Sequence, residues 1–140
     1  MTTTPAIPEG FQPHFRRSPL TDPWEPIFSQ RTEAAVAIGL RLAGAHTNSR
    51  GFAHGGLITA LADNAMGLSC GTQLQGVSGL VTVSLSIDFV GSARVGQWLE
   101  VRPRVIKVGS AICFAECLVT ADEALCARAN ATFAYRRAKA

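Results

Sequence analysis

Residues 57–73, LITALADNAMGLSCGTQ, carry the one convincing helix pattern of the chain. Their apolar side chains recur at spacings of three and four residues, which places them along one face of an α-helix. These side chains are Leu57, Ile58, Leu61, Ala62, Ala65 and Leu68. A single helix with such a stripe needs a sheet to cover it, because the stripe would otherwise face water.

The sequence that follows has the two-residue period of β-strands. In residues 80–90, apolar and often β-branched side chains alternate with polar ones, which predicts a strand. The same alternation places Thr82, Ser84, Ser86 and Asp88 on one face, the last three as interface or solvated positions. Further strands are predicted at residues 97–108, 111–121 and 124–136, separated by turns at 109–110 and 122–123.

Two short strands around a turn near Thr32 are predicted in residues 27–44, followed by a loop at residues 45–56. The order is therefore short strands, one helix and an antiparallel meander. This order predicts the α+β hotdog fold, a curved antiparallel sheet wrapped around one central helix. Residues 1–26 hold most of the seven prolines and little periodicity, so we expect an irregular arm before a folded domain at residues 27–140.

Composition narrows the classes of function. The 140 residues suit one domain, and the net charge of +3 without a long basic run argues against nucleic-acid binding. The N-terminus lacks a secretory signal pattern, and the longest apolar stretch is too short to cross a bilayer, so we expect a cytoplasmic protein that does not enter membranes. The four cysteines and three histidines lack metal-ligand spacing; we expect buried thiols and no metal.

The helix pattern contains one residue that does not fit it. Asp63 interrupts the apolar segment, and aspartate is unfavourable within a helix. Its neighbours on the same face are mostly small, which leaves room for a ligand to reach the carboxylate; they are Gly56, Thr59, Ala60 and Gly67. The pattern predicts a catalytic carboxylate, with a solvated aspartate as the alternative.

Gly55 and Gly56 lie where the loop enters the helix. Glycine allows close approach to the backbone, and the free N–H groups of a first helical turn favour an oxygen that carries negative charge. A thioester carbonyl becomes such an oxygen under nucleophilic attack. Because Gly55 and Asp63 are eight residues, about 12 Å, apart along a helix, one carbonyl cannot contact both within one chain. A shared reaction therefore requires a homodimer with two sites.

The string NSRGFAHGGLITALADNAMG, residues 48–67, resembles the active-site segment of the PaaI-type hotdog thioesterases of phenylacetate pathways, and the similarity extends over residues 27–136. The resemblance implies hydrolysis of acyl-CoA to a free acid and CoA without a further cofactor. It assigns Asp63 as general base or nucleophile, the Gly55 N–H as oxyanion donor, Asn48 as the residue that places the water or the carbonyl, and Thr82 as support. His54 is expected to hold the loop, with proton transfer as its alternative role.

The sequence identifies the substrate-binding residues less specifically than the catalytic ones. We expect Gly56, Phe52, Met66 and Phe89 near the acyl group, and the candidate partners for CoA phosphates are Arg94, Lys107, Arg136 and Arg137. Aromatic and medium-chain acyl groups both remain open. The alternative functions are a hotdog hydratase or dehydratase, which needs a histidine with an acidic partner, and a non-catalytic acyl-CoA-binding protein. Apolar side chains on both faces of residues 111–121 favour a homotetramer over a dimer.

Overall fold

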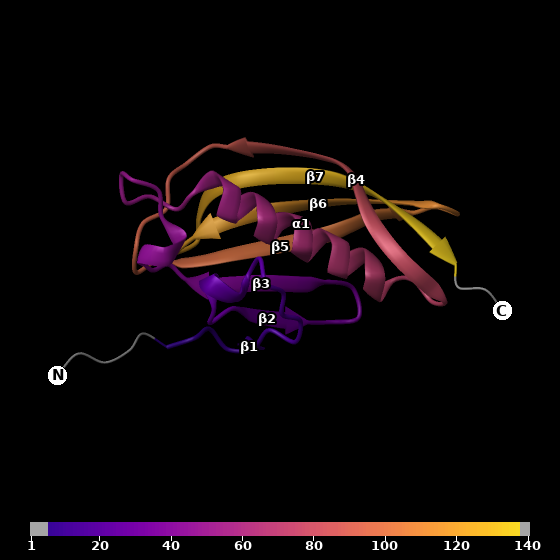
Figure 1. The fold of residues 1–140 in the computed structure, drawn as a ribbon, viewed down its shortest axis with the longest axis horizontal. Helices are drawn as coiled ribbons and strands as arrows, with labels where there is room; N and C mark the ends of the chain where they lie inside the picture. The colour runs from indigo at the N-terminus through magenta and orange to yellow at the C-terminus, as the bar shows by residue number, and fades with distance from the viewer. Residues whose placement is uncertain (1–5, 138–140) are drawn as a thin grey trace.

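The computed structural model describes residues 6–137 (Figure 1). Its elements, in chain order, are β1 (Gln12–Pro13), η1 (Asp22–Trp24), β2 (Phe28–Arg31), β3 (Val36–Arg41), η2 (Gly44–His46), α1 (Gly55–Thr72), β4 (Val77–Phe89), β5 (Trp98–Val108), β6 (Ile112–Ala121) and β7 (Ala124–Arg137). The seven strands form one antiparallel sheet in the order β1-β2-β3-β5-β6-β7-β4. Helix α1 crosses this sheet, as Figure 1 shows. The hotdog fold predicted from the sequence is confirmed.

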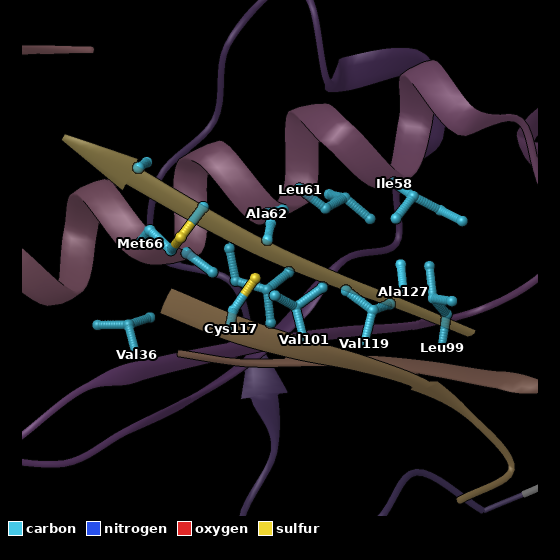
Figure 2. Packing of buried hydrophobic residues seen from close by; sticks show 14 of the residues in the cluster. Val36, Ile58, Leu61, Ala62, Met66, Leu99, Val101, Cys117, Val119 and Ala127 are labelled. Atoms are coloured by element: carbon cyan, nitrogen blue, oxygen red, sulfur yellow. The ribbon is translucent and has the colours of Figure 1, made fainter. Parts of the chain in front are cut away.

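The core lies between α1 and the sheet. The buried side chains of α1 follow the predicted stripe, and Figure 2 shows Ile58, Leu61 and Ala62 directed at the strands below. The sheet contributes small and β-branched side chains, including Val101 and Val119, both fully buried. The inner face of β7 contributes the buried alanines Ala127, Ala129 and Ala131. The helix itself packs mainly over β5 and β6.

One buried hydroxyl ties the helix to the start of β3. Ser69 Oγ donates to the Ala65 carbonyl at 2.7 Å and accepts the Val36 N–H at 2.9 Å. Both contacts are inside the protein, so the hydroxyl is satisfied despite its complete burial. The bond fixes β3 against the C-terminal half of α1.

Strand β4 contains a β-bulge that corrects one expectation. Thr82 pairs with Phe133 and Ser84 with the adjacent Thr132, so Val83 is an extra residue without a partner on β7. The side-chain alternation therefore changes phase at Val83. Thr82 faces the helix, whereas Ser84 and the polar residues after it lie on the opposite, outer face. The expectation that these residues share the face of Thr82 is wrong.

The N-terminal arm packs on the domain. Its strand β1 pairs with β2, and the ring of Phe11 contacts that of Trp98 edge-on at 5.3 Å between centroids. Thr21 is buried, and the Trp24 carbonyl lies 2.9 Å from His46 Nε2. These contacts hold both ends of the segment between β1 and β2, so its path over the domain is defined.

All four cysteines are buried free thiols, as expected. Burial raises the pKa of the Cys117 thiol to about 12, because removal from water disfavours the thiolate. A neutral, inert thiol fits a role as a small apolar side chain. No helix within residues 6–137 has both the length and the apolar character needed to cross a membrane.

Two glycines give a matched test of this packing. A Cβ at Gly39 would overlap the Trp98 ring, whereas a Cβ at the helical Gly71 would meet no atom within 4 Å. We expect Gly39→Ala to lower the free energy of unfolding by about 1–3 kcal/mol. We expect Gly71→Ala to raise it by about 0.5–1 kcal/mol, because alanine favours the helix. Urea unfolding measures both, and an unchanged Gly39→Ala variant would contradict the close packing of Trp98.

Candidate active site

The centre of the candidate site is a hydrogen bond between α1 and β4. Thr82 Oγ1 donates to Asp63 Oδ1 at 2.7 Å. Within residues 6–137, the Asp63 carboxylate makes no other side-chain hydrogen bond. One oxygen is thus held by Thr82 and the other is left for a ligand. The bond depends on the bulge at Val83, because this bulge lets Thr82 face inward together with the apolar side chains that follow it.

Asp63 lies in a cleft of about 720 Å³, a volume that suits a small-molecule ligand. The outer face of α1 forms the floor, with Asp63, Asn64, Gly67, Leu68, Gly71 and Thr72. The start of β4 forms one wall, and residues 14–18 and 21 of the N-terminal arm, with Arg31, form another. Of the small residues predicted around Asp63, Gly67 lines this cleft, whereas Gly56, Thr59 and Ala60 lie outside it.

The start of α1 is set by His54. Its Nδ1 accepts the Gly56 N–H at 2.7 Å, so His54 is the N-cap and the helix begins at Gly55, two residues earlier than predicted. This bond occupies the Gly56 N–H. The Gly55 N–H has no acceptor among the described residues, and it is the first donor of the turn. The backbone donor predicted at Gly55 is therefore available to a ligand.

Phe89, at the end of β4, lies against the same turn. A Cβ at Gly55 would come within 3.1 Å of the Phe89 ring, so a larger residue there requires this ring to shift by a few tenths of an ångström. Phe89 is half exposed and borders the Gly55 N–H. Asp63 lies about 12 Å further along the helix axis, so the two ends of the predicted machinery do not meet within one protomer.

Asn48 shapes the loop before the helix. Its Oδ1 accepts the N–H groups of Arg50 at 2.9 Å and of Phe52 at 3.2 Å, which closes a tight turn. The carboxamide oxygen is thus used locally, while the side-chain NH₂ group donates to no residue that the structure describes. Any contact between Asn48 and a ligand must come through this NH₂ group.

The other predicted contacts fall into three places. Arg94 stacks over the Phe52 ring at 5.2 Å, and this pair lies close to the helix start. Met66 is fully buried in the core beneath α1 and does not line the cleft (Figure 2). Its spacing of four residues from Ala62 places it on the sheet-facing stripe. The remaining candidates for CoA phosphates, Lys107, Arg136 and Arg137, are exposed and lie outside the cleft.

The sequence patterns missed the arm side of the cleft. His14, Arg16, Arg17 and Arg31 line it, although residues 1–26 show no period that would place them beside the helix. The one available signal was the adjacent arginine pair. Burial lowers the pKa of His14, and the Arg16 guanidinium acts in the same direction, while Glu25 partly offsets both. His14 Nδ1 is buried and has no partner among the described residues.

Comparison with known proteins identifies the family of this chain. Residues 50–127 match the family model described as the thioesterase superfamily. The chain belongs to the thioesterase superfamily. A Pseudomonas aeruginosa protein named as an esterase is 43% identical over 91% of this chain and 96% of its own length. The mouse acyl-coenzyme A thioesterase 13 is 30% identical over 50% of this chain and 49% of its own length.

Solved structures share the fold of this chain. The Streptococcus mutans protein bound to acetyl CoA matches with a TM-score of 0.76 and 25% identity, over 91% of this chain and 98% of its own. The phenylacetic acid degradation protein PaaI of Thermus thermophilus, in a mutant form, matches with a TM-score of 0.74 and 21% identity over 85% of this chain and 99% of its own. At this identity, the match to PaaI shows that the two proteins share a fold. The resemblance to PaaI-type hotdog thioesterases is confirmed, and the predicted enzyme class is confirmed at the level of the family.

The cap gives a test of the role of His54. We expect His54→Ala to lower the free energy of unfolding by about 1 kcal/mol, because it removes the acceptor for the Gly56 N–H. Asparagine is a good N-cap but cannot transfer a proton at neutral pH, so His54→Asn should restore both stability and thiol release from acyl-CoA. A His54→Asn variant that is stable but inactive would instead assign proton transfer to His54. Urea unfolding and a thiol assay measure the two quantities.

Proposed function

We propose that this protein hydrolyses acyl-CoA thioesters with Asp63 as the reacting carboxylate. The observation that carries the proposal is the Asp63–Thr82 hydrogen bond at the floor of an open cleft. The bond orients the carboxylate and leaves one of its oxygens for a water molecule or for the thioester carbonyl carbon. The solved relatives that hold coenzyme A or acetyl CoA support an acyl-CoA as the substrate.

The reaction places negative charge first on the carbonyl oxygen and then on the leaving thiolate. Asp63 either takes a proton from a water that attacks the carbonyl carbon, or attacks this carbon directly to form an anhydride that water then cleaves. In both cases the carbonyl oxygen becomes negative, and a backbone N–H at a helix start stabilises it. Collapse of the intermediate breaks the C–S bond and releases CoA as thiolate, which then takes up a proton. The products are the free acid and CoA.

A second protomer supplies the donor in this proposal. Gly55 and Asp63 are about 12 Å apart along one helix, so the donor for a carbonyl at Asp63 comes from the partner. Strand β4 is an edge strand of the sheet, opposite the two-residue edge strand β1, and two of its valines, Val81 and Val83, are 64% and 61% exposed. An apolar edge strand of this length favours pairing with another strand. A two-fold axis beside β4 would bring the start of one α1 towards the Asp63 cleft of the partner.

A larger assembly has its own support. The outer face of the sheet carries exposed apolar side chains on β5 and β6, namely Ile106, Val108, Ile112, Phe114 and Leu118. Such a patch marks an interaction surface. We therefore favour dimers that associate through their outer faces into a tetramer.

The geometry favours hydrolysis over hydration. A hotdog hydratase needs a histidine with an acidic partner in the pocket, and His54 instead uses Nδ1 to cap α1. His46, the other histidine of this loop, is buried and bonds to the backbone of Ala43 and Trp24. Neither histidine has a carboxylate partner within residues 6–137. The third histidine, His14, lines the cleft, but its ring forms no hydrogen bond or ion pair with a carboxylate among these residues.

Substitution of Asp63 tests the reaction. We expect Asp63→Asn to reduce kcat/KM at least a hundredfold, because the amide neither accepts a proton nor attacks the carbonyl carbon. Asp88→Asn is the matched control, since Asp88 lies on the outer face of β4 and pairs with Arg128 at 3.0 Å. Thiol release from phenylacetyl-, benzoyl-, hexanoyl- and decanoyl-CoA measures both variants and identifies the preferred acyl class. Turnover that survives Asp63→Asn would contradict the mechanism.

A proline at Gly55 tests the donor. His54 has φ −71° and ψ 134°, a backbone conformation that tolerates a following proline, and proline is favoured at the first helical position. We expect Gly55→Pro to remove the N–H and reduce kcat about 10²–10³-fold. Gly55→Ala adds the same Cβ against Phe89 but keeps the N–H, so it separates a steric effect from the loss of the donor.

Mixed dimers of the two inactive variants decide which chain supplies the donor. If Gly55 acts across the dimer, a heterodimer of Gly55→Pro and Asp63→Asn protomers has one intact site. Random 1:1 reassociation should then restore about a quarter of wild-type activity. If both groups act within one chain, the mixture stays as inactive as its components, and the dimer site is disproved.

A further inference from the structure

The N-terminal arm closes one side of the Asp63 cleft with positive charge. We define the arm wall as residues 14–18 together with Arg31, all of which line the cleft. Asp63 is the sole carboxylate among the lining residues, whereas the wall contributes three arginines. An excess of positive charge facing a ligand cleft attracts and orients an anionic group.

Two of these arginines lack an acidic partner. Arg17 lies 3.4 Å from Asp22, a weak and exposed pair, but Arg16 and Arg31 form no ion pair within residues 6–137. By contrast, three arginines on the outer face of the sheet pair with carboxylates; these are Arg102, Arg104 and Arg128. The unpaired guanidinium groups of the wall are therefore free to form paired hydrogen bonds with a carboxylate or a phosphate.

The wall is also pre-organised. The Arg31 guanidinium carbon lies 4.6 Å from the centre of the Phe15 ring, which restrains this long side chain. The backbone beneath it is held by the pairing of β1 with β2 and by the turn in which Ser18 and Thr21 hydrogen-bond. A binding group that is already ordered loses less conformational entropy when a ligand arrives.

The cleft has the length to separate a reacting thioester from a bound anion. Its floor runs along α1 from Asp63 to Thr72, nine residues or about 13 Å. Polar and small side chains occupy much of this floor and of the β4 wall, including Asn64, Gly67 and Ser78. Such a lining suits a polar group at a distance from the thioester better than a long aliphatic chain does.

We propose that the arm wall is a substrate-binding element that recognises a negatively charged group of the thioester, through Arg16 and Arg31. This inference rests on the proposed hydrolysis at Asp63. The anion has two possible sources with the same chemistry: a carboxylate at the far end of the acyl group, or a phosphate of coenzyme A. Either source assigns the arm a direct role in substrate selection.

The test uses the Arg16→Gln/Arg31→Gln double variant of the full chain. Arg104→Gln is the control, because it removes a positive charge from the outer face, away from the cleft. The substrates are hexanoyl-CoA, adipyl-CoA and hexanoyl-pantetheine. They differ in the acyl carboxylate and in the nucleotide phosphates. Arg31→Lys, which keeps the charge but loses the paired hydrogen bonds, checks that any effect does not stem from unfolding of the arm.

Each outcome has one reading. A loss of about tenfold or more in kcat/KM for adipyl-CoA alone assigns the wall to an acyl carboxylate. A similar loss for both CoA substrates, with hexanoyl-pantetheine unchanged, assigns it to a CoA phosphate. Changes below about twofold for all three, or an equal loss for all three including the pantetheine, would overturn the proposal.

A binding measurement separates this inference from the proposed reaction. Calorimetric titration with S-hexyl-CoA and S-(5-carboxypentyl)-CoA, which cannot be hydrolysed, reports recognition alone. The first outcome is that the double variant binds either thioether about tenfold more weakly than the wild type does, while the wild type releases no thiol from acyl-CoA. This outcome supports anion recognition by the arm wall and contradicts the proposed hydrolysis. If hydrolysis proceeds and neither thioether distinguishes the double variant from Arg104→Gln, the reaction stands and the arm wall fails.

Discussion

Helix α1 has one apolar stripe, and burial of this stripe against the sheet fixes the direction of every other side chain on the helix. With Leu61 and Met66 held in the core, Asp63 lies on the side of the helix that faces the edge strand β4, where Thr82 donates to its carboxylate. The same rotation exposes the small residues of the outer face. The hydrophobic effect, which carries no chemical specificity of its own, thereby sets the position of the reacting carboxylate.

Much of this arrangement could be predicted because it follows from local periodicity. The helix and the strands follow simple spacing rules, and Asp63 stands out because it interrupts the apolar spacing of the helix. The bulge at Val83 could not be predicted in this way. It is defined by pairing with Phe133 and Thr132 on β7, about fifty residues later in the chain, while the alternation within β4 itself continues without a break. The prediction that Ser84, Ser86 and Asp88 share the face of Thr82 failed for that reason.

The arm illustrates a second limit. Residues 14–18 have no period of their own, and their neighbours are decided by the path of the chain between β1 and β2. That path depends on long-range contacts such as Phe11 with Trp98, which no local pattern encodes. Met66 is the opposite case. Its spacing from Ala62 already placed it on the buried stripe, so the expectation that it lines the cleft could have been avoided.

The bulge also bears on how this strand can change during evolution. Val83 has no partner on β7, so its removal would leave Thr82 facing the helix and Ser84 facing outward, in a regular alternation. Loss of a paired residue elsewhere in β4 would instead move the side chains on one side of the deletion to the opposite face of the sheet. Deletion of residue 83 is thus a length change that the fold can absorb. Homologues that differ there by one residue can keep the same side chains on each face.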